Sequence, residues 1–175
     1  LAGAQAELAA FLARADIPAA RTLLGLSALS TFHPLNMGMV GMHGNYAPNM
    51  KTQECDVLIA VGMRFSDRVT GNLATYARQA KVIHLDIDVT EIDKNVKTDV
   101  AVLGDCRQTL AAITDRLEPA RHTEWIGSFA KYADMERQKV IERAIHPTEG
   151  PLLMGEVINE VAEQTQANAI LVNDV

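Results

Sequence analysis

The sequence is poor in aromatic residues and in cysteine, and each shortage excludes a class of protein. Aromatic residues make up 5% of the 175 residues and hydrophobic residues 48%, so the core must consist mainly of aliphatic side chains. The two cysteines, Cys55 and Cys106, are far apart and form no Cys-x-x-Cys pair. This spacing argues against a disulfide framework or a zinc site and is typical of a cytoplasmic protein.

Other signals are also missing. No basic run accompanies the net charge of -6, which argues against a nucleic-acid partner. No apolar stretch approaches the ~20 residues that cross a bilayer, so no membrane association is expected. No signal peptide is visible, although the chain begins at Leu1 without a methionine. The Gly-x-Gly-x-x-Gly fingerprint of ordinary dinucleotide-binding folds is absent as well.

Short apolar segments alternate with segments of helical periodicity. The predicted strands are 17–20, 56–61, Lys81–Asp86, Val100–Leu103 and 169–172. The predicted helices are 3–15, 105–117, 123–143 and 152–164. This alternation predicts an α/β fold with a Rossmann-like parallel sheet flanked by helices. Residues 22–49, rich in Gly, Met, Pro, His and Asn, are expected to form a long functional loop, and residues 146–151 a linker.

Glycines, hydroxyls, arginines and carboxylates follow the predicted strands. These residues occupy positions 22–25, 62–68, 86–88 and 104–105. Parallel α/β sheets bind ligands beyond the carboxyl ends of their strands. Glycines let backbone amides approach a pyrophosphate, an acid at a strand end can accept hydrogen bonds from a ribose, and arginines can bind phosphate. The pattern therefore predicts a nucleotide site.

Each of these groups also has an ordinary structural explanation. Gly62 could simply form a turn, and Asp105 could cap the helix that follows it. For Asp88 a capping role is the favoured explanation. Arg64 and Arg68 could form surface ion pairs of little energetic value. The strand-end residues alone therefore leave the choice open.

The segment GMVGMHG at residues 38–44 is unusual for its three glycines, two methionines and one histidine. The glycines would allow the backbone to lie flat against a ligand, and methionine thioethers pack well on aromatic rings. His43 could stack on a planar heterocycle or hydrogen-bond to it. The alternative is a tightly packed turn around a buried histidine, which the residues alone favour.

Four segments together resemble the central domain of acetohydroxyacid (acetolactate) synthase catalytic subunits, which belong to the thiamine-diphosphate enzymes. They read GMVGMHGNYAPN, CDVLIAVGMRFSDRVTG, AKVIHLDID and LGDC. The resemblance is strong over residues 3–118. It implies that this domain holds FAD without a net redox role, whereas two other domains hold thiamine diphosphate and Mg²⁺. The implied enzyme joins a two-carbon unit from pyruvate to pyruvate or 2-oxobutyrate in branched-chain amino acid biosynthesis.

Carried over position by position, the resemblance implies a set of FAD contacts. The residues implied at the flavin side and near the first strand are Thr22, Leu23, Gly41, Met42, His43 and Gly44. Those implied along the pyrophosphate and the channel to the active site are Gly62, Arg64, Asp67, Arg68 and Val69. Those implied around the adenosine are Asp86, Ile87, Glu91, Gly104 and Asp105. No catalytic residue and no metal ligand is implied in this chain.

The resemblance also sets limits. It implies a central domain over residues 1–146, followed by a linker and the start of the thiamine-binding domain over 147–175. The family's first strand and glycine-rich loop would precede Leu1, so we expect a sheet lacking one strand, weakened FAD binding and no activity of the chain alone. Ser66 and Val89 depart from the family pattern, which has an aspartate and a proline there.

Partners and alternatives follow from the same resemblance. The full-length subunit is expected to form a homodimer or homotetramer, with a separate small regulatory subunit as a possible partner. One alternative is the equivalent domain of a sister enzyme, such as pyruvate oxidase, glyoxylate carboligase or a decarboxylase that binds ADP. Another is a non-catalytic nucleotide-binding module.

Overall fold

The computed structural model describes residues 2–147, 149–166, 168–170 and 172. Two compact units divide the chain, one over Leu1–Tyr132 and the other over Ala133–Val175. The predicted domain boundary after residue 146 stays a prediction. We describe each unit by itself.

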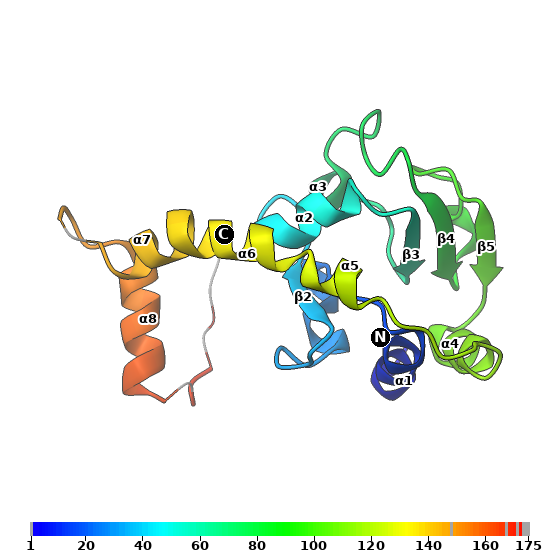
Figure 1. Ribbon diagram of the computed structural model, residues 1–175, viewed down its shortest axis with the longest axis horizontal. Coiled ribbons are helices and arrows are strands. Elements are labelled where there is room, and N and C mark those ends of the chain that lie inside the picture. Colours follow the sequence, from blue (N-terminus) through cyan, green and yellow to red (C-terminus); the bar gives the residue numbers. More distant parts are fainter. Residues whose placement is uncertain (1, 148, 167, 171, 173–175) are drawn as a thin grey trace. The chain divides into compact units, whose positions relative to one another are not determined.

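The strands of the first unit are β1 (Ala19–Arg21), β2 (Asn36–Met39), β3 (Val57–Val61), β4 (Lys81–Asp86) and β5 (Val100–Leu103). Every strand pair of this unit is parallel, and Figure 1 shows β3, β4 and β5 side by side and pointing the same way. The strands form two sheets, β1-β2 and β3-β4-β5, so neither β1 nor β3 has a second strand neighbour among the residues described. The predicted class, an α/β fold with parallel strands flanked by helices, is confirmed, although the strands do not form one continuous sheet.

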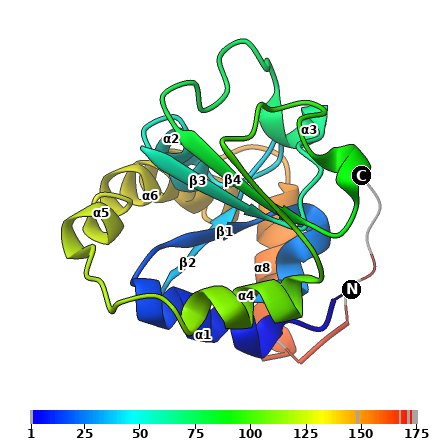
Figure 2. The same cartoon turned by 90° about the vertical axis from the view of Figure 1, so that its right-hand side faces the viewer.

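One hydrophobic core serves both sheets. Helices α1 (Gln5–Ala15) and α4 (Cys106–Thr114) lie side by side, as Figure 2 shows. The buried members of this core are Phe11, Leu12, Leu29, Leu35, Leu85 and Leu110. Ala19 of β1 and Ile59 of β3 pack against the same cluster. Because burying one such side chain contributes ~1.5–3 kcal/mol, this core holds the two sheets on the same helices.

A second core covers the opposite face of β3 and β4. It consists of Ala60, Phe65, Tyr76, Ala77 and Val82. Successive side chains of a strand point to opposite faces, so Ala60 and Val82 face this cluster while their neighbours face α1 and α4. Strands β3 and β4 are therefore covered on both faces, as the continuous apolar runs at 56–61 and 81–86 predict.

The remaining helical elements of the first unit are short. They are η1 (Leu23–Ala28), α2 (Tyr46–Thr52), α3 (Asp67–Thr70), η2 (Val89–Glu91), α5 (Thr123–Gly127) and α6 (Ala130–Glu136), the last of which ends in the second unit. The predicted bounds of β4 and β5 are confirmed, and the predicted strands at 17–20 and 56–61 correspond to β1 and β3 with shifted ends.

Two predictions in the first unit are wrong. Residues 22–49 are not one long loop, because they contain η1, β2 and the start of α2. The sequence of β2, NMGM, carries no β-branched residue, and pairing with β1 makes it extended. The predicted helix 123–143 is interrupted at residues 128–129. There the Ser128 hydroxyl donates a hydrogen bond to Trp125 O at 2.6 Å, a local bond that competes with the helix.

The second unit is helical. Its elements are a π-helical segment (Arg137–Ile141), α7 (Glu142–Ile145) and α8 (Met154–Gln164). The Glu156 carboxylate accepts a hydrogen bond from Leu153 N at 2.7 Å, which caps the start of α8. Residues 146–151 carry no helix or strand where they are described, and their role as a linker stays a prediction.

The predicted strand 169–172 is wrong at residues 169, 170 and 172, which belong to no strand, and residue 171 lies outside the described residues. Residues 173–175 also lie outside them. Throughout the ranges that the structure describes, every helix is too short or too polar to span a bilayer.

Candidate functional site

The carboxyl ends of β3, β4 and β5 bring three of the predicted residues together. Gly62 N donates to Leu85 O at 2.8 Å, and Gly104 N donates to Asp86 O at 2.9 Å. These bonds continue the parallel ladders by one residue beyond β3 and β5, so Gly62, Asp86 and Gly104 lie at one edge of the sheet. The backbone amides of Gly62 and Gly104 already donate these two bonds, so a ligand at this edge would accept hydrogen bonds from other groups.

Asp86 is the buried acid of this edge, with 7% of its surface exposed. Its Oδ1 accepts a hydrogen bond from Asp88 N at 2.9 Å, which fixes the carboxylate. Its Oδ2 lies 3.6 Å from the Nε2 atom of His84. The next residue, Ile87, is 71% exposed and presents apolar surface beside the carboxylate. This pairing suits a ribose hydroxyl and the flat face of a base.

His84 was not singled out from the sequence, although a polar residue inside the apolar run KVIHLD was an available signal. Its side chain is fully buried and packs edge-on against Phe65, with ring centroids 5.1 Å apart. Nε2 lies 2.9 Å from Met63 O. Because a carbonyl only accepts, Nε2 carries the proton and donates this bond. His84 therefore ties the turn after β3 to the centre of the sheet.

The predicted capping roles of Asp88 and Asp105 are confirmed. Asp88 accepts from Thr90 N and caps η2, and its pKa is lowered chiefly by the Thr90 hydroxyl that donates to the same oxygen. Asp105 accepts from Arg107 N and Gln108 N at the start of α4. Capping occupies Oδ1 of Asp105 in both bonds. A ligand role for Asp105 stays a prediction.

Glu91 and Cys106 lie close to these acids in sequence. One oxygen of Glu91 pairs with the Lys94 ammonium at 2.8 Å, and the other is buried without a hydrogen-bond partner in the described part of the chain. Cys106 is the first residue of α4. The pKa of its thiol is raised first by burial and then by the charges of Asp86 and Asp105. Both Cys55 and Cys106 are free thiols.

The surface ion pairs considered for the two arginines do not form. The Arg64 guanidinium makes no ion pair within the ranges described, and that of Arg68 reaches the Met42 sulfur at 3.6 Å. Between them Phe65 has a φ of +50°, which is rare for a bulky residue. The Asn95 side chain donates to Phe65 O at 3.1 Å and supports this turn.

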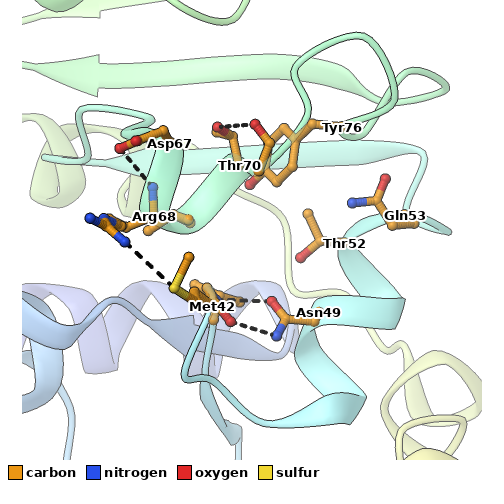
Figure 3. Close-up of a pocket in the computed structure, with 12 residues that line it drawn as sticks. Met42, Asn49, Thr52, Gln53, Asp67, Arg68, Thr70 and Tyr76 are labelled. Atoms are coloured by element: carbon orange, nitrogen blue, oxygen red, sulfur yellow. Dashed lines mark hydrogen bonds between the residues drawn. The ribbon is translucent and has the colours of Figure 1, made fainter. Parts of the chain in front are cut away.

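A cavity of about 280 Å³ lies beside Met42 and Arg68 (Figure 3). It is lined by Val40, Gly41, Met42, Asn49, Thr52, Gln53, Asp67, Arg68, Val69, Thr70, Gly71 and Tyr76. Five of the predicted residues, from two separate segments, meet here. Burial raises the pKa of Tyr76 to about 12, so its phenol stays protonated at neutral pH.

The glycines of the GMVGMHG segment serve a tight turn. A side chain at Gly41 would place its Cβ 2.8 Å from Arg68 O, and one at Gly44 would place it 2.4 Å from Met39 O. The alternative to a ligand contact, predicted from the sequence, is a tightly packed turn around a buried histidine. The packed turn is confirmed for the backbone, but the buried histidine is wrong, because His43 is exposed. Met42 is 62% exposed, so the turn presents both side chains outward.

Thr22 and Leu23 stand apart from both groups. They follow β1, in the other sheet, and Thr22 O accepts from Gly25 N within its own helical turn. As for metals, no three histidine, cysteine, aspartate or glutamate side chains of the described ranges are grouped to hold an ion.

Comparison with known proteins identifies the family of this chain. A profile of the thiamine pyrophosphate enzyme central domain matches residues 1–113. A probable acetolactate synthase large subunit of Methanocaldococcus jannaschii is 39% identical over 181 residues, covering 100% of this chain and 30% of the relative. The acetolactate synthase large subunit of Lactococcus lactis is 39% identical, covering 95% of this chain and 28% of the relative.

The acetolactate synthase isozyme 2 large subunit of Escherichia coli is also 39% identical, covering 100% of this chain. The chain spans 28–30% of the length of these three relatives. The profile covers more than half of the chain, including β1 to β5 and the residues at their ends. The chain therefore belongs to the thiamine pyrophosphate enzyme family, whose central domain it contains.

Proposed function

We propose that this chain is the FAD-holding central domain of an acetolactate synthase large subunit. The whole enzyme would condense pyruvate with pyruvate or 2-oxobutyrate in branched-chain amino acid biosynthesis. The proposal is supported by the three relatives, all of which carry that name. It also draws on the motifs GMHG and RFSDRVTG.

The observation that carries the proposal is the meeting of Gly62, Asp86 and Gly104 at one sheet edge. Residues far apart in sequence are joined there by two backbone bonds of 2.8 and 2.9 Å. Ligands of parallel α/β sheets bind beyond the carboxyl ends of the strands. A buried carboxylate between two glycines at that edge has the chemistry to accept hydrogen bonds from a ribose.

The residues present fit FAD at both ends. Oδ2 of Asp86 and the unpartnered oxygen of Glu91 are acceptors for hydroxyl or amine donors. Arg64, which makes no ion pair among the described residues, would neutralise pyrophosphate charge. Met42 and His43 offer a soft thioether and a planar ring to the flavin. When bound, FAD would supply a planar surface without a net redox step.

The other parts of the enzyme are proposed from the family. Thiamine diphosphate and Mg²⁺ would be bound by domains outside this chain, so we expect no acetolactate formation from the chain alone. Subunit association into a dimer or tetramer, a small regulatory subunit and a cytoplasmic location belong to the same proposal. Asp67, Arg68 and Val69 would form one wall of the channel to the active site.

A flavin titration tests the proposal. We expect the full-length protein to quench FAD fluorescence saturably, with weaker binding of FMN, which lacks the adenosine. Asp86→Ala should weaken FAD binding about tenfold or more, since it removes a charged acceptor worth ~1.5–3 kcal/mol. Asp115→Ala is the matched control, because Asp115 lies at the far end of α4.

The alternatives give different results in the same titration. Equal affinity for ADP and FAD would indicate a decarboxylase-like domain. Binding of neither nucleotide would contradict the proposal. Binding of FAD without acetolactate formation by the full-length protein would favour a sister enzyme.

A further inference from the structure

The side chain of Asn49 holds the backbone of Gly41 at two points. Its Oδ1 accepts a hydrogen bond from Gly41 N and its Nδ2 donates one to Gly41 O, both at 2.9 Å (Figure 3). Both polar atoms of one amide are thus used on one residue, eight positions earlier in the chain. Asn49 lies within α2, so the two bonds connect a helix to the GMVGMHG turn.

Gly41 is also the point at which this turn meets the segment after β3. Its φ is +110°, and it is buried. A Cβ there would come within 2.8 Å of Arg68 O. The same carbonyl accepts a hydrogen bond from Met42 N at 2.8 Å. The position of Gly41 therefore decides where Met42 lies relative to Arg68.

The two side chains beyond this junction are in contact. Nη1 of Arg68 lies 3.6 Å from Sδ of Met42, and both side chains line the cavity. Neither contacts Asn49 through a hydrogen bond. The hydrogen bonds of the Asn49 side chain therefore reach them through the backbone of Gly41.

We propose that Asn49 is a positioning residue for the flavin end of the FAD site, and that it acts by fixing Gly41 and, through it, Met42 and Arg68. This inference rests on the proposed function and extends it to a residue outside the set expected from the sequence. The adenosine end, at Asp86 and Gly104, is built on the carboxyl ends of β4 and β5, to which Asn49 makes no hydrogen bond among the described residues. Asn49 should therefore affect the flavin contact and leave the adenosine contact unchanged.

The test compares FAD with ADP in the full-length protein. We expect Asn49→Ala to raise the dissociation constant of FAD about tenfold while changing that of ADP less than about twofold. The absorption spectrum of bound flavin should also shift, because the environment of the ring changes. Asn49→Asp keeps the size of the side chain but replaces the donor to Gly41 O by an oxygen, so the same selective loss is expected. Asn159→Ala is the control, since within the described residues its side-chain amide donates only to Glu163.

Each outcome decides between the possibilities. A selective loss of FAD affinity with an unchanged melting temperature supports the positioning role of Asn49. Equal weakening of FAD and ADP, or no weakening of either, overturns it while leaving the proposed function standing. If Asn49→Ala does not fold, the result for Asn49→Asp decides in the same way. If the wild-type protein binds neither nucleotide, both proposals are overturned.

Discussion

At the scale of single residues, Cys106 is a reactive group beside Gly62 at the proposed site. It is the first residue of α4, and an ideal Cβ built at Gly62 lies 3.7 Å from its sulfur. Burial, then Asp86 and Asp105, raises the pKa of its thiol above the ordinary value. The two carboxylates disfavour a third negative charge, so the thiol stays protonated at neutral pH.

Cys106 should accordingly react slowly with iodoacetamide at pH 7–8. Because the thiolate is the reactive form and the pKa is raised, the rate should keep increasing at a pH where an ordinary thiol has already reached its maximum. Saturating FAD should slow the reaction at every pH. A Cys55→Ala background isolates the signal, and alkylation is followed by mass spectrometry. A rate that levels off at or below the pH of a free thiol would contradict this prediction.

At the scale of elements, a buried lysine joins α2 to α5. The Lys51 ammonium lies 4.7 Å from the centroid of the Trp125 ring and 2.7 Å from the Glu54 carboxylate. Glu54 in turn accepts a hydrogen bond from the Tyr132 hydroxyl, and its pKa is lowered first by Lys51 and then by Tyr132. Helices α5 and α6 thus contact α2 and the turn after it through the side chains of Lys51 and Glu54.

Lys51→Met should therefore destabilise the first unit by ~1–3 kcal/mol, since it removes a desolvated cation–π contact and leaves Glu54 without its cation. The measurement is urea unfolding followed by Trp125 fluorescence. Lys81→Met, at the exposed first position of β4, is the matched control and should change stability by less than ~0.5 kcal/mol. A similar loss in both variants would show that the contact with Trp125 contributes nothing specific.

At the scale of the whole molecule, the chain divides into a unit with the candidate site and a helical unit without it. All sixteen predicted contact residues lie before Tyr132, in the first unit. A ligand that binds only the folded first unit stabilises that unit by mass action. The second unit would gain nothing directly.

FAD at 100 times its dissociation constant should stabilise the first unit by ~2.7 kcal/mol. In hydrogen exchange, the amides of β3, β4 and β5 should become more protected, while those of α8 should not change. Uniform protection of both units would mean that they unfold as one body. No protection in β4 would place the ligand elsewhere.

The sequence by itself determined the elements that have strong local signals. The runs 56–61 and 81–86 are continuous and apolar because those strands are buried on both faces, and that pattern is readable without a structure. Asp88 and Asp105 were recognisable as caps because capping depends on neighbours two or three residues away. The strand-end rule then located Gly62, Asp86 and Gly104, and their adjacency is confirmed.

Only the tertiary structure decided the features that depend on distant contacts. β2 is a strand because β1 pairs with it, and its own residues gave no such signal. Gly41 and Gly44 of GMVGMHG are required by Arg68 O and Met39 O, the first of which lies in another segment. Asn49 could not be singled out, since its value lies in reaching back to Gly41. Local patterns record local bonds, whereas the site is assembled by backbone contacts between segments that the sequence keeps apart.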